Sequence, residues 1–326
     1  MKKILALLLA LWIPAAVLSG CVPQDDSAAS NKLNIVTTIF PAYDWVREIL
    51  GDETDRAEMT TLLDSGVDLH SYQPTVDDIV KISDCDLFLY VGGESDGWVE
   101  DALKNAPNKD RQVIRLLDVL GDSAKAEETV AGMQEEEHDH EEEAEYDEHI
   151  WLSLKNAQVL VAAISEALQE TDPARKDTYA ANAAAYVEKL SALDGEYRAA
   201  VDSGKYKTLL FGDRFPFRYL ADDYGLDYYA AFPGCSAETE ASFETVSFLA
   251  GKMDALGLPC VLTIEGTQHK IAETIVQNTA QKNQQILTMD SMQAVTANDA
   301  ASGVSYLSIM EKNLSVLKKA LGQEAE

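Results

Sequence analysis

Basic side chains are scarce in this sequence of 326 residues. Lysine and arginine together number 26, whereas aspartate and glutamate number 56, which gives a formal net charge of -30 at pH 7. Such an acidic surface repels the phosphates of nucleic acids and the headgroups of anionic lipids. The composition therefore argues against a nucleic-acid partner and a basic membrane-binding patch, and it favours a cationic ligand.

Cysteines and long apolar runs are also few. Four cysteines are too few for a disulfide scaffold in a chain of this length. The apolar run from Ile4 to Leu18 is short for crossing about 30 Å of hydrocarbon. Hydrophobic residues still make up 46% of the chain, which is enough for packed cores, and the length predicts about two domains.

The N-terminal residues predict the compartment of the protein. A basic start, Met1–Lys3, leads into the apolar run, which ends in Leu18–Cys21, a sequence that resembles the bacterial lipobox. Residues 1–20 are predicted to be a signal peptide whose removal leaves Cys21 acylated; an ordinary secretory signal or an anchor helix are the alternatives. Residues 21–32 are predicted to be a flexible tether. The protein is thus expected to be lipid-anchored on the extracytoplasmic face of a bacterial cytoplasmic membrane.

Predicted strands and helices alternate on both sides of one long helix. The alternation over 33–171 and again over 204–326, without hairpin signals, predicts two α/β lobes, each with a parallel sheet flanked by helices. Apolar residues at three- and four-residue steps predict a helix over 172–203, about 45 Å long, which acts as a rigid strut. The strands are expected at 33–38, 86–91, 112–116, 208–211, 226–230, 260–264 and 285–289.

An acidic segment interrupts this pattern at residues 133–148. Residues 135–148 hold ten carboxylates in fourteen positions, with His138 and His140 among them. The segment cannot bury enough apolar surface to offset its ordering entropy, so a disordered loop is predicted. Imidazoles among carboxylates suit weak, exchangeable metal binding, which would make this an accessory metal loop. A solvated charged loop without ligands is the alternative.

Two histidines and one carboxylate are placed where a cation could bind. His70 and Asp290 lie in predicted loops at the carboxyl ends of strands, and His149 opens another loop. Such loops line the ligand crevice of an open α/β sheet, so the three side chains could close around a divalent cation. Spacing alone leaves the alternative that they are solvated surface residues, as we expect for His269.

Several short motifs together resemble one protein family. They are Thr37–Pro41, Asp68–Pro74, Val91–Gly93 with Trp98, His149–Ser153, Phe217–Leu220 with Tyr224–Leu226, Glu265–Gln268 and Met289–Asp290. The chain resembles the metal-binding lipoproteins of ABC importers for zinc or manganese, of the zinc-uptake type (cluster A-I). The resemblance implies two lobes bridged by a rigid helix with metal in the interlobe cleft. It also implies that His70, His149 and Asp290 are ligands.

The fourth ligand position departs from the family. The family places a histidine or glutamate ten residues before the tyrosine of a Tyr-Gly pair, and counting back from Tyr224 gives Arg214. A guanidinium has no lone pair to offer a metal. Asp213 or Glu265 could substitute, with a slight preference for Asp213. Alternatively, Arg214 pairs with one of these carboxylates and three protein ligands remain.

The resemblance implies a receptor that hands zinc, or alternatively manganese, to the permease and ATPase subunits of an importer. Imidazole nitrogen suits zinc, whereas additional oxygen ligands favour manganese. We expect a monomer. We also expect no enzymatic activity, because lobes closing around the ion would shield the open coordination position that a catalytic metal needs. A surface adhesin with the same fold and a zinc-dependent hydrolase are the alternative functions.

Three cysteines remain once Cys21 is lipidated, and an odd number cannot all pair within the chain. We expect at most one disulfide and one free thiol among Cys85, Cys235 and Cys260. Buried structural thiols are an equally good interpretation.

Overall fold

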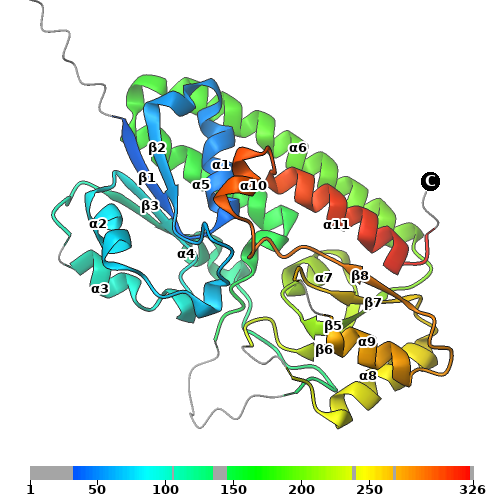
Figure 1. Ribbon diagram of the computed structural model, residues 1–326. Helices are drawn as coiled ribbons and strands as arrows, with labels where there is room; N and C mark the ends of the chain where they lie inside the picture. The colour runs from blue at the N-terminus through cyan, green and yellow to red at the C-terminus, as the bar shows by residue number, and fades with distance from the viewer. Residues whose placement is uncertain (1–31, 105, 135–144, 237–239, 267–268, 324–326) are drawn as a thin grey trace, which may run out of the picture. The chain divides into compact units, whose positions relative to one another are not determined.

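Two four-stranded sheets organise the chain in the computed structural model, which describes residues 32–104, 106–134, 145–236, 240–266 and 269–323. The strand orders are β2-β1-β3-β4 and β6-β5-β7-β8, and all neighbouring strands are parallel (Figure 1). The strands are β1 (Leu33–Thr37), β2 (Ala57–Thr61), β3 (Leu87–Tyr90), β4 (Gln112–Arg115), β5 (Thr208–Arg214), β6 (Asp227–Phe232), β7 (Cys260–Thr263) and β8 (Gln285–Thr288). The predicted fold class, two parallel α/β lobes joined by a long helix, is confirmed.

Helices flank both sheets. They are α1 (Phe40–Leu50), α2 (Val76–Asp84), α3 (Val99–Lys104), α4 (Leu116–Leu120), α5 (Leu154–Thr171), α6 (Lys176–Ser203), α7 (Arg218–Tyr224), α8 (Phe243–Leu256), α9 (Lys270–Asn278), α10 (Ala297–Ala301) and α11 (Tyr306–Ala320). We call the first sheet with α1–α5 the N-terminal lobe and the second sheet with α7–α9 the C-terminal lobe. No helix of the described ranges is long and apolar enough to cross a membrane. Cys21, His138 and His140 lie outside the described residues.

All seven predicted strands form, but β2 was not predicted. It is an edge strand, paired only with β1, and Ala57 is its one buried residue. Its sequence, Ala-Glu-Met-Thr-Thr, holds no run of large apolar residues, unlike those of the edge strands β4 and β8. Its position still matters, because the loop that follows it carries His70.

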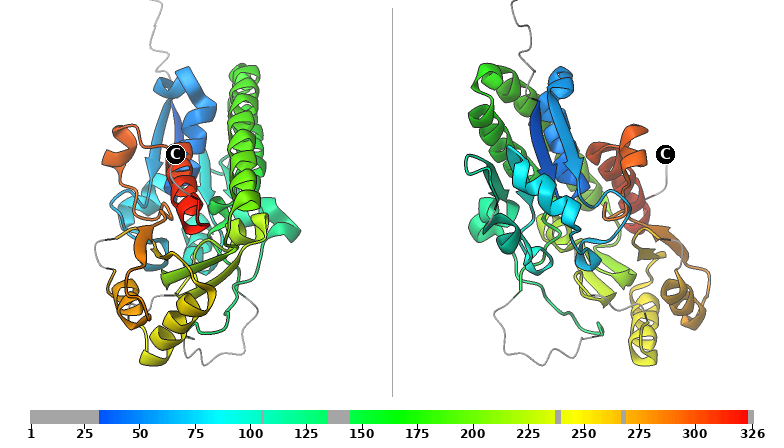
Figure 2. Two further views of the ribbon diagram at one scale, coloured as in Figure 1. Left: turned by 90° about the vertical axis from the view of Figure 1, so that its right-hand side faces the viewer. Right: turned by 60° about the vertical axis from the view of Figure 1, so that its left-hand side comes forward.

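Helix α6 connects the two lobes. It is 28 residues long and follows a short 3-10 turn, Pro173–Arg175, so the predicted helix is confirmed. Its predicted stripe of large residues is buried, including Tyr179, Tyr186 and Tyr197. The helix packs against α1 and α5 of the N-terminal lobe and against α7 and α11 further along (Figure 2). One rigid element therefore supports both sheets.

The last two helices leave the second sheet and pack on the N-terminal lobe. Helix α11 contacts α1 and α6, and Arg47 donates to the carbonyl of Ala300 in α10. Asp44 of α1 is fully buried, pairs with Arg47 and accepts a hydrogen bond of 2.8 Å from the backbone N–H of Tyr306, the first residue of α11. The Asp44 carboxylate thus ties two distant parts of the chain together.

The buried Asp44 should make stability depend on pH. Burial raises the pKa of Asp44 from 3.8 to about 6, against the opposing effect of Arg47. Between these values the folded protein binds more protons than the unfolded chain, so the free energy of unfolding falls as pH rises. Asp44→Asn cannot ionise, so its deficit in unfolding free energy relative to wild type should shrink from pH 4.5 to 7 by about 2 kcal/mol. Urea unfolding at both pH values measures this; an identical deficit at both would contradict it.

Candidate metal centre

A tight turn after β2 fixes His70. Asp68 precedes the 3-10 turn Leu69–Ser71, and its carboxylate accepts the backbone N–H of His70 at 3.0 Å. The side chain of Leu69 is buried and anchors the turn in the core. The Nδ1 atom of His70 lies 2.9 Å from Ser95 Oγ and 3.5 Å from Glu148 Oε2. Both contacts orient the ring through Nδ1 and leave Nε2 for another partner.

Asp147 fixes His149 in the same way. One oxygen of this buried carboxylate accepts both the backbone N–H of His149, at 2.9 Å, and its Nδ1–H, at 3.0 Å. His149 itself is fully buried, and its ring lies 5.3 Å from that of Trp151. A carboxylate on Nδ1 selects the tautomer with the proton there, so the Nε2 lone pair is available.

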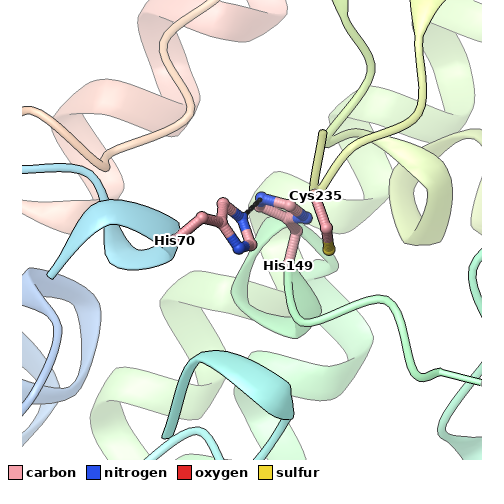
Figure 3. A group of neighbouring side chains, drawn as sticks. All are labelled: His70, His149 and Cys235. Atoms are coloured by element: carbon pink, nitrogen blue, oxygen red, sulfur yellow. Dashed lines mark hydrogen bonds between the residues drawn. The ribbon is translucent and has the colours of Figure 1, made fainter. Parts of the chain in front are cut away.

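The two imidazoles face each other through Nε2. These nitrogens are 3.3 Å apart. Figure 3 joins them by a dashed line. Two nitrogens held 2.0–2.1 Å from one tetrahedral zinc ion would lie about 3.3 Å apart. The Asp147 carboxylate leaves the Nε2 lone pair of His149 facing His70, and a cation between the two nitrogens would let both rings bind it through Nε2. His70 and His149, predicted separately as ligands, are thus brought together.

Cys235 is the third member of this group. In the described part of the chain, the His, Cys, Asp or Glu side chains that could hold a metal together are His70, His149 and Cys235, with ligand atoms within 4.8 Å of one another. Cys235 comes from the loop after β6, so the C-terminal lobe supplies it (Figure 3). A Cβ on Gly234 would lie 3.2 Å from His149 Nδ1 and 2.9 Å from the carbonyl oxygen of Phe215, so a glycine lets this loop approach His149 closely.

The electrostatics of the group favour a bound cation. Burial, followed by the neighbouring His149, lowers the pKa of His70, so this imidazole is neutral and able to ligate. Burial raises the pKa of the Cys235 thiol, and the carboxylates of Asp147 and Glu127 raise it further. Burial also raises the pKa of Glu148 to about 7. A divalent cation would reverse the effect on the thiol, because positive charge stabilises a thiolate.

Arg214 pairs across the two lobes. Its guanidinium donates to Asp68 at 2.5 Å and to the carbonyl oxygen of Ser236 at 3.3 Å. The alternative, an ion pair of Arg214 with Asp213 or Glu265, is therefore wrong: the Arg214 ion pair is formed with the carboxylate that caps the His70 turn. Arg214 thus joins the His70 turn to the loop that carries Cys235.

The three predicted carboxylates do not join the histidine–cysteine group. Asp213 accepts the backbone N–H groups of Arg214 and Ile264. Glu265 accepts hydrogen bonds from the backbone and hydroxyl of Ser291. Asp290 lies after β8 and accepts the N–H of Met292, and burial together with Glu265 raises its pKa to about 6. Each carboxylate is engaged with backbone in the C-terminal lobe, and their ligand role stays a prediction.

Sequence reasoning missed Cys235, Ser95 and the orienting carboxylates. Asp147 and Glu148 lie in the run that was predicted to be disordered, yet both are buried beside the histidines. His269, which was expected to be a surface residue, is half-buried at the N-terminus of α9 and makes no capping hydrogen bond with its side chain. The three described cysteines are free thiols; Cys85 and Cys260 are buried, as one of the two interpretations predicted.

Removing the carboxylate behind His149 should weaken metal binding. We expect Asp147→Ala to lower zinc affinity by about 10–100-fold, because the ring loses the acceptor that fixes its tautomer. Asp147→Asn keeps an acceptor oxygen and should lose less. Competition with a zinc chelator measures both affinities; wild-type affinity in Asp147→Ala would show that Asp147 does not orient the ligand.

Two parallel α/β lobes on one long helix, with imidazoles and a thiol meeting from both lobes, define a two-lobed binding protein for a small cation. The sequence matches the family described as zinc-uptake complex component A, periplasmic, over residues 35–320. The chain belongs to this family, which confirms the resemblance drawn from its motifs.

Two relatives extend this result. The zinc-binding lipoprotein AdcA of Streptococcus pneumoniae is 33% identical over 329 residues, covering 99% of this chain and 62% of AdcA. The chain thus spans less than two thirds of that relative. The high-affinity zinc uptake system protein ZnuA of Bacillus subtilis is 29% identical over 297 residues, 89% of this chain and 88% of ZnuA.

A solved structure agrees with the fold. The Zn(II)-bound ZnuA-like domain of Streptococcus pneumoniae AdcA matches with a TM-score of 0.69 at 30% identity, covering 90% of this chain and 100% of that domain.

Proposed function

We propose that this protein is an extracytoplasmic zinc receptor that delivers the ion to an ABC permease. The observation that carries the proposal is the pair of Nε2 atoms 3.3 Å apart, each on a ring held through Nδ1. This geometry matches two corners of a tetrahedral zinc site without rearrangement of either ring. Family membership over residues 35–320 supports the same function.

The ligand set begins with His70 and His149. Tetrahedral zinc takes four ligands, so two further donors are needed. Asp290 is the carboxylate that the family resemblance assigns, and Asp213 and Glu265 are the substitutes for the position that Arg214 occupies. Imidazole donors favour zinc over manganese, so zinc is the proposed cargo. His138 and His140 would act as an accessory metal loop.

The partners follow from the family. The permease and ATPase subunits of a metal importer would receive the ion, and a lipid on Cys21 would hold the protein, a monomer, at the membrane. The proposed division is a leader at 1–20, a tether at 21–32, lobes at 33–171 and 204–326, and a linking helix at 172–203. The adhesin and hydrolase alternatives are not favoured, because the chain belongs to the family of zinc-uptake components.

Zinc uptake in cells tests this proposal. Deletion of the gene should lower zinc accumulation in zinc-limited medium, and the wild-type gene should restore it. His70→Ala should fail to restore uptake, whereas His269→Ala, which alters a histidine outside the group, should succeed. Full uptake with His70→Ala would contradict the proposal.

A further inference from the structure

We propose that Cys235 is a thiolate ligand of the zinc ion, in place of the side chain that the family uses where this chain has Arg214. This inference rests on the proposed function, and it makes the site a mixed imidazole–thiolate site. The loop after β6 supplies the sulfur, and the N-terminal lobe supplies both imidazoles.

Distances support the sulfur as a ligand. The ligand atoms of Cys235, His70 and His149 lie within 4.8 Å of one another. In tetrahedral zinc sites, with Zn–S of about 2.3 Å and Zn–N of about 2.0–2.1 Å, sulfur and nitrogen lie about 3.6 Å apart. A closer approach of the sulfur to the two Nε2 atoms would therefore complete three corners of the coordination sphere. The imidazole pair already has the spacing that zinc needs.

The loop that carries Cys235 is held against the histidines by three independent contacts. Gly234 lets the backbone pass directly over the His149 ring. The carboxylate of Glu127, from the N-terminal half of the chain, accepts the backbone N–H of Cys235 at 2.8 Å. Arg214 binds the carbonyl oxygen of the next residue, Ser236. These contacts hold the sulfur close to both imidazoles, where it could share an ion with them.

Arg214 is a positioning residue in this arrangement. Its guanidinium bonds Asp68, which caps the His70 turn, and the Ser236 carbonyl oxygen, which follows Cys235. Arg214, which cannot bind a metal itself, therefore connects the loops that carry His70 and Cys235. Arg214 thus replaces one family ligand and, by binding the Ser236 carbonyl oxygen, also holds the loop that supplies the Cys235 thiolate.

Zinc binding would release a proton from the thiol. The S–H bond breaks, the sulfur keeps the electron pair and donates it to zinc, and the proton leaves to solvent; no oxidant or reductant is required. Thiolate is a soft donor that suits zinc and disfavours manganese. Cys235 would thereby raise selectivity for zinc over manganese as well as affinity.

X-ray absorption at the zinc edge of the zinc-loaded full chain tests the proposal. We expect one sulfur at about 2.3 Å together with imidazole nitrogens at about 2.0–2.1 Å. Cys235→Ser should lose the sulfur signal and at least about 10-fold in zinc affinity, with a smaller change for manganese. Cys260→Ser, which alters a buried cysteine of β7, is the matched control and should keep both.

The outcomes separate this inference from the proposed function. Imidazole signals without sulfur in the wild type would overturn Cys235 as a ligand and leave the zinc receptor intact. A spectrum without imidazoles would overturn the proposed function itself. If Cys235→Ser does not fold, the wild-type spectrum still decides, and zinc should also protect Cys235 from alkylation by iodoacetamide.

Discussion

His149→Ala should abolish tight zinc binding. We expect the dissociation constant to rise at least about 100-fold, more than the loss of an orienting residue would cause, because a ligand itself is removed. His149 is fully buried and its Nε2 faces that of His70, so no other imidazole of the described residues can take its place. Calorimetry with zinc on the full chain measures the change.

His269→Ala is the matched control for this measurement. It also removes an imidazole, but this one lies at the N-terminus of α9, outside the histidine–cysteine group. The zinc affinity should therefore stay within about threefold of the wild-type value. Unchanged affinity in His149→Ala would place the tight site elsewhere, either among the C-terminal carboxylates or in the acidic residues 135–144.

Trp151→Ala should be among the most destabilising single substitutions in this protein. The indole is 1% exposed and donates from Nε1 to the carbonyl oxygen of Ser291 at 2.8 Å. The backbone carbonyl oxygen of Trp151 accepts a hydrogen bond from the hydroxyl of Tyr306. Truncation would leave a cavity and an unpaired carbonyl between distant segments, at a cost of about 3–5 kcal/mol. Urea unfolding of the metal-free protein measures the loss.

Trp98→Ala is the comparison for this prediction. Trp98 is only half-buried and its ring lies 6.0 Å from that of Tyr72, so its removal should cost less than half as much. Equal losses for the two variants, or less than about 1 kcal/mol for Trp151→Ala, would contradict the importance of the buried indole.

The fold could be predicted wherever a buried element has an apolar pattern in its own sequence. Central strands such as β3 and β7 are apolar runs because both faces of a parallel sheet are covered. Strand β2 was missed because its five residues hold no apolar run. The return of α10 and α11 to the N-terminal lobe depends on contacts such as Asp44 with Tyr306, which join residues far apart in the sequence and carry no local signal.

The site could be predicted only in part, for a similar reason. His70 and His149 lie in motifs that the family resemblance identifies. Cys235 has no partner at a metal-ligand spacing along the chain, so only folding shows that it lies beside His149. Arg214 marked the departure from the family, but its partner Asp68 belongs to the other lobe, and no sequence pattern connects the two.

Diffraction from zinc-loaded crystals, with anomalous data at the zinc edge, tests the central claim most directly. The account predicts one strong peak about 2.0–2.1 Å from Nε2 of both His70 and His149. A zinc peak bound only by Asp290, Asp213 or Glu265, with both imidazoles uncoordinated, would contradict it.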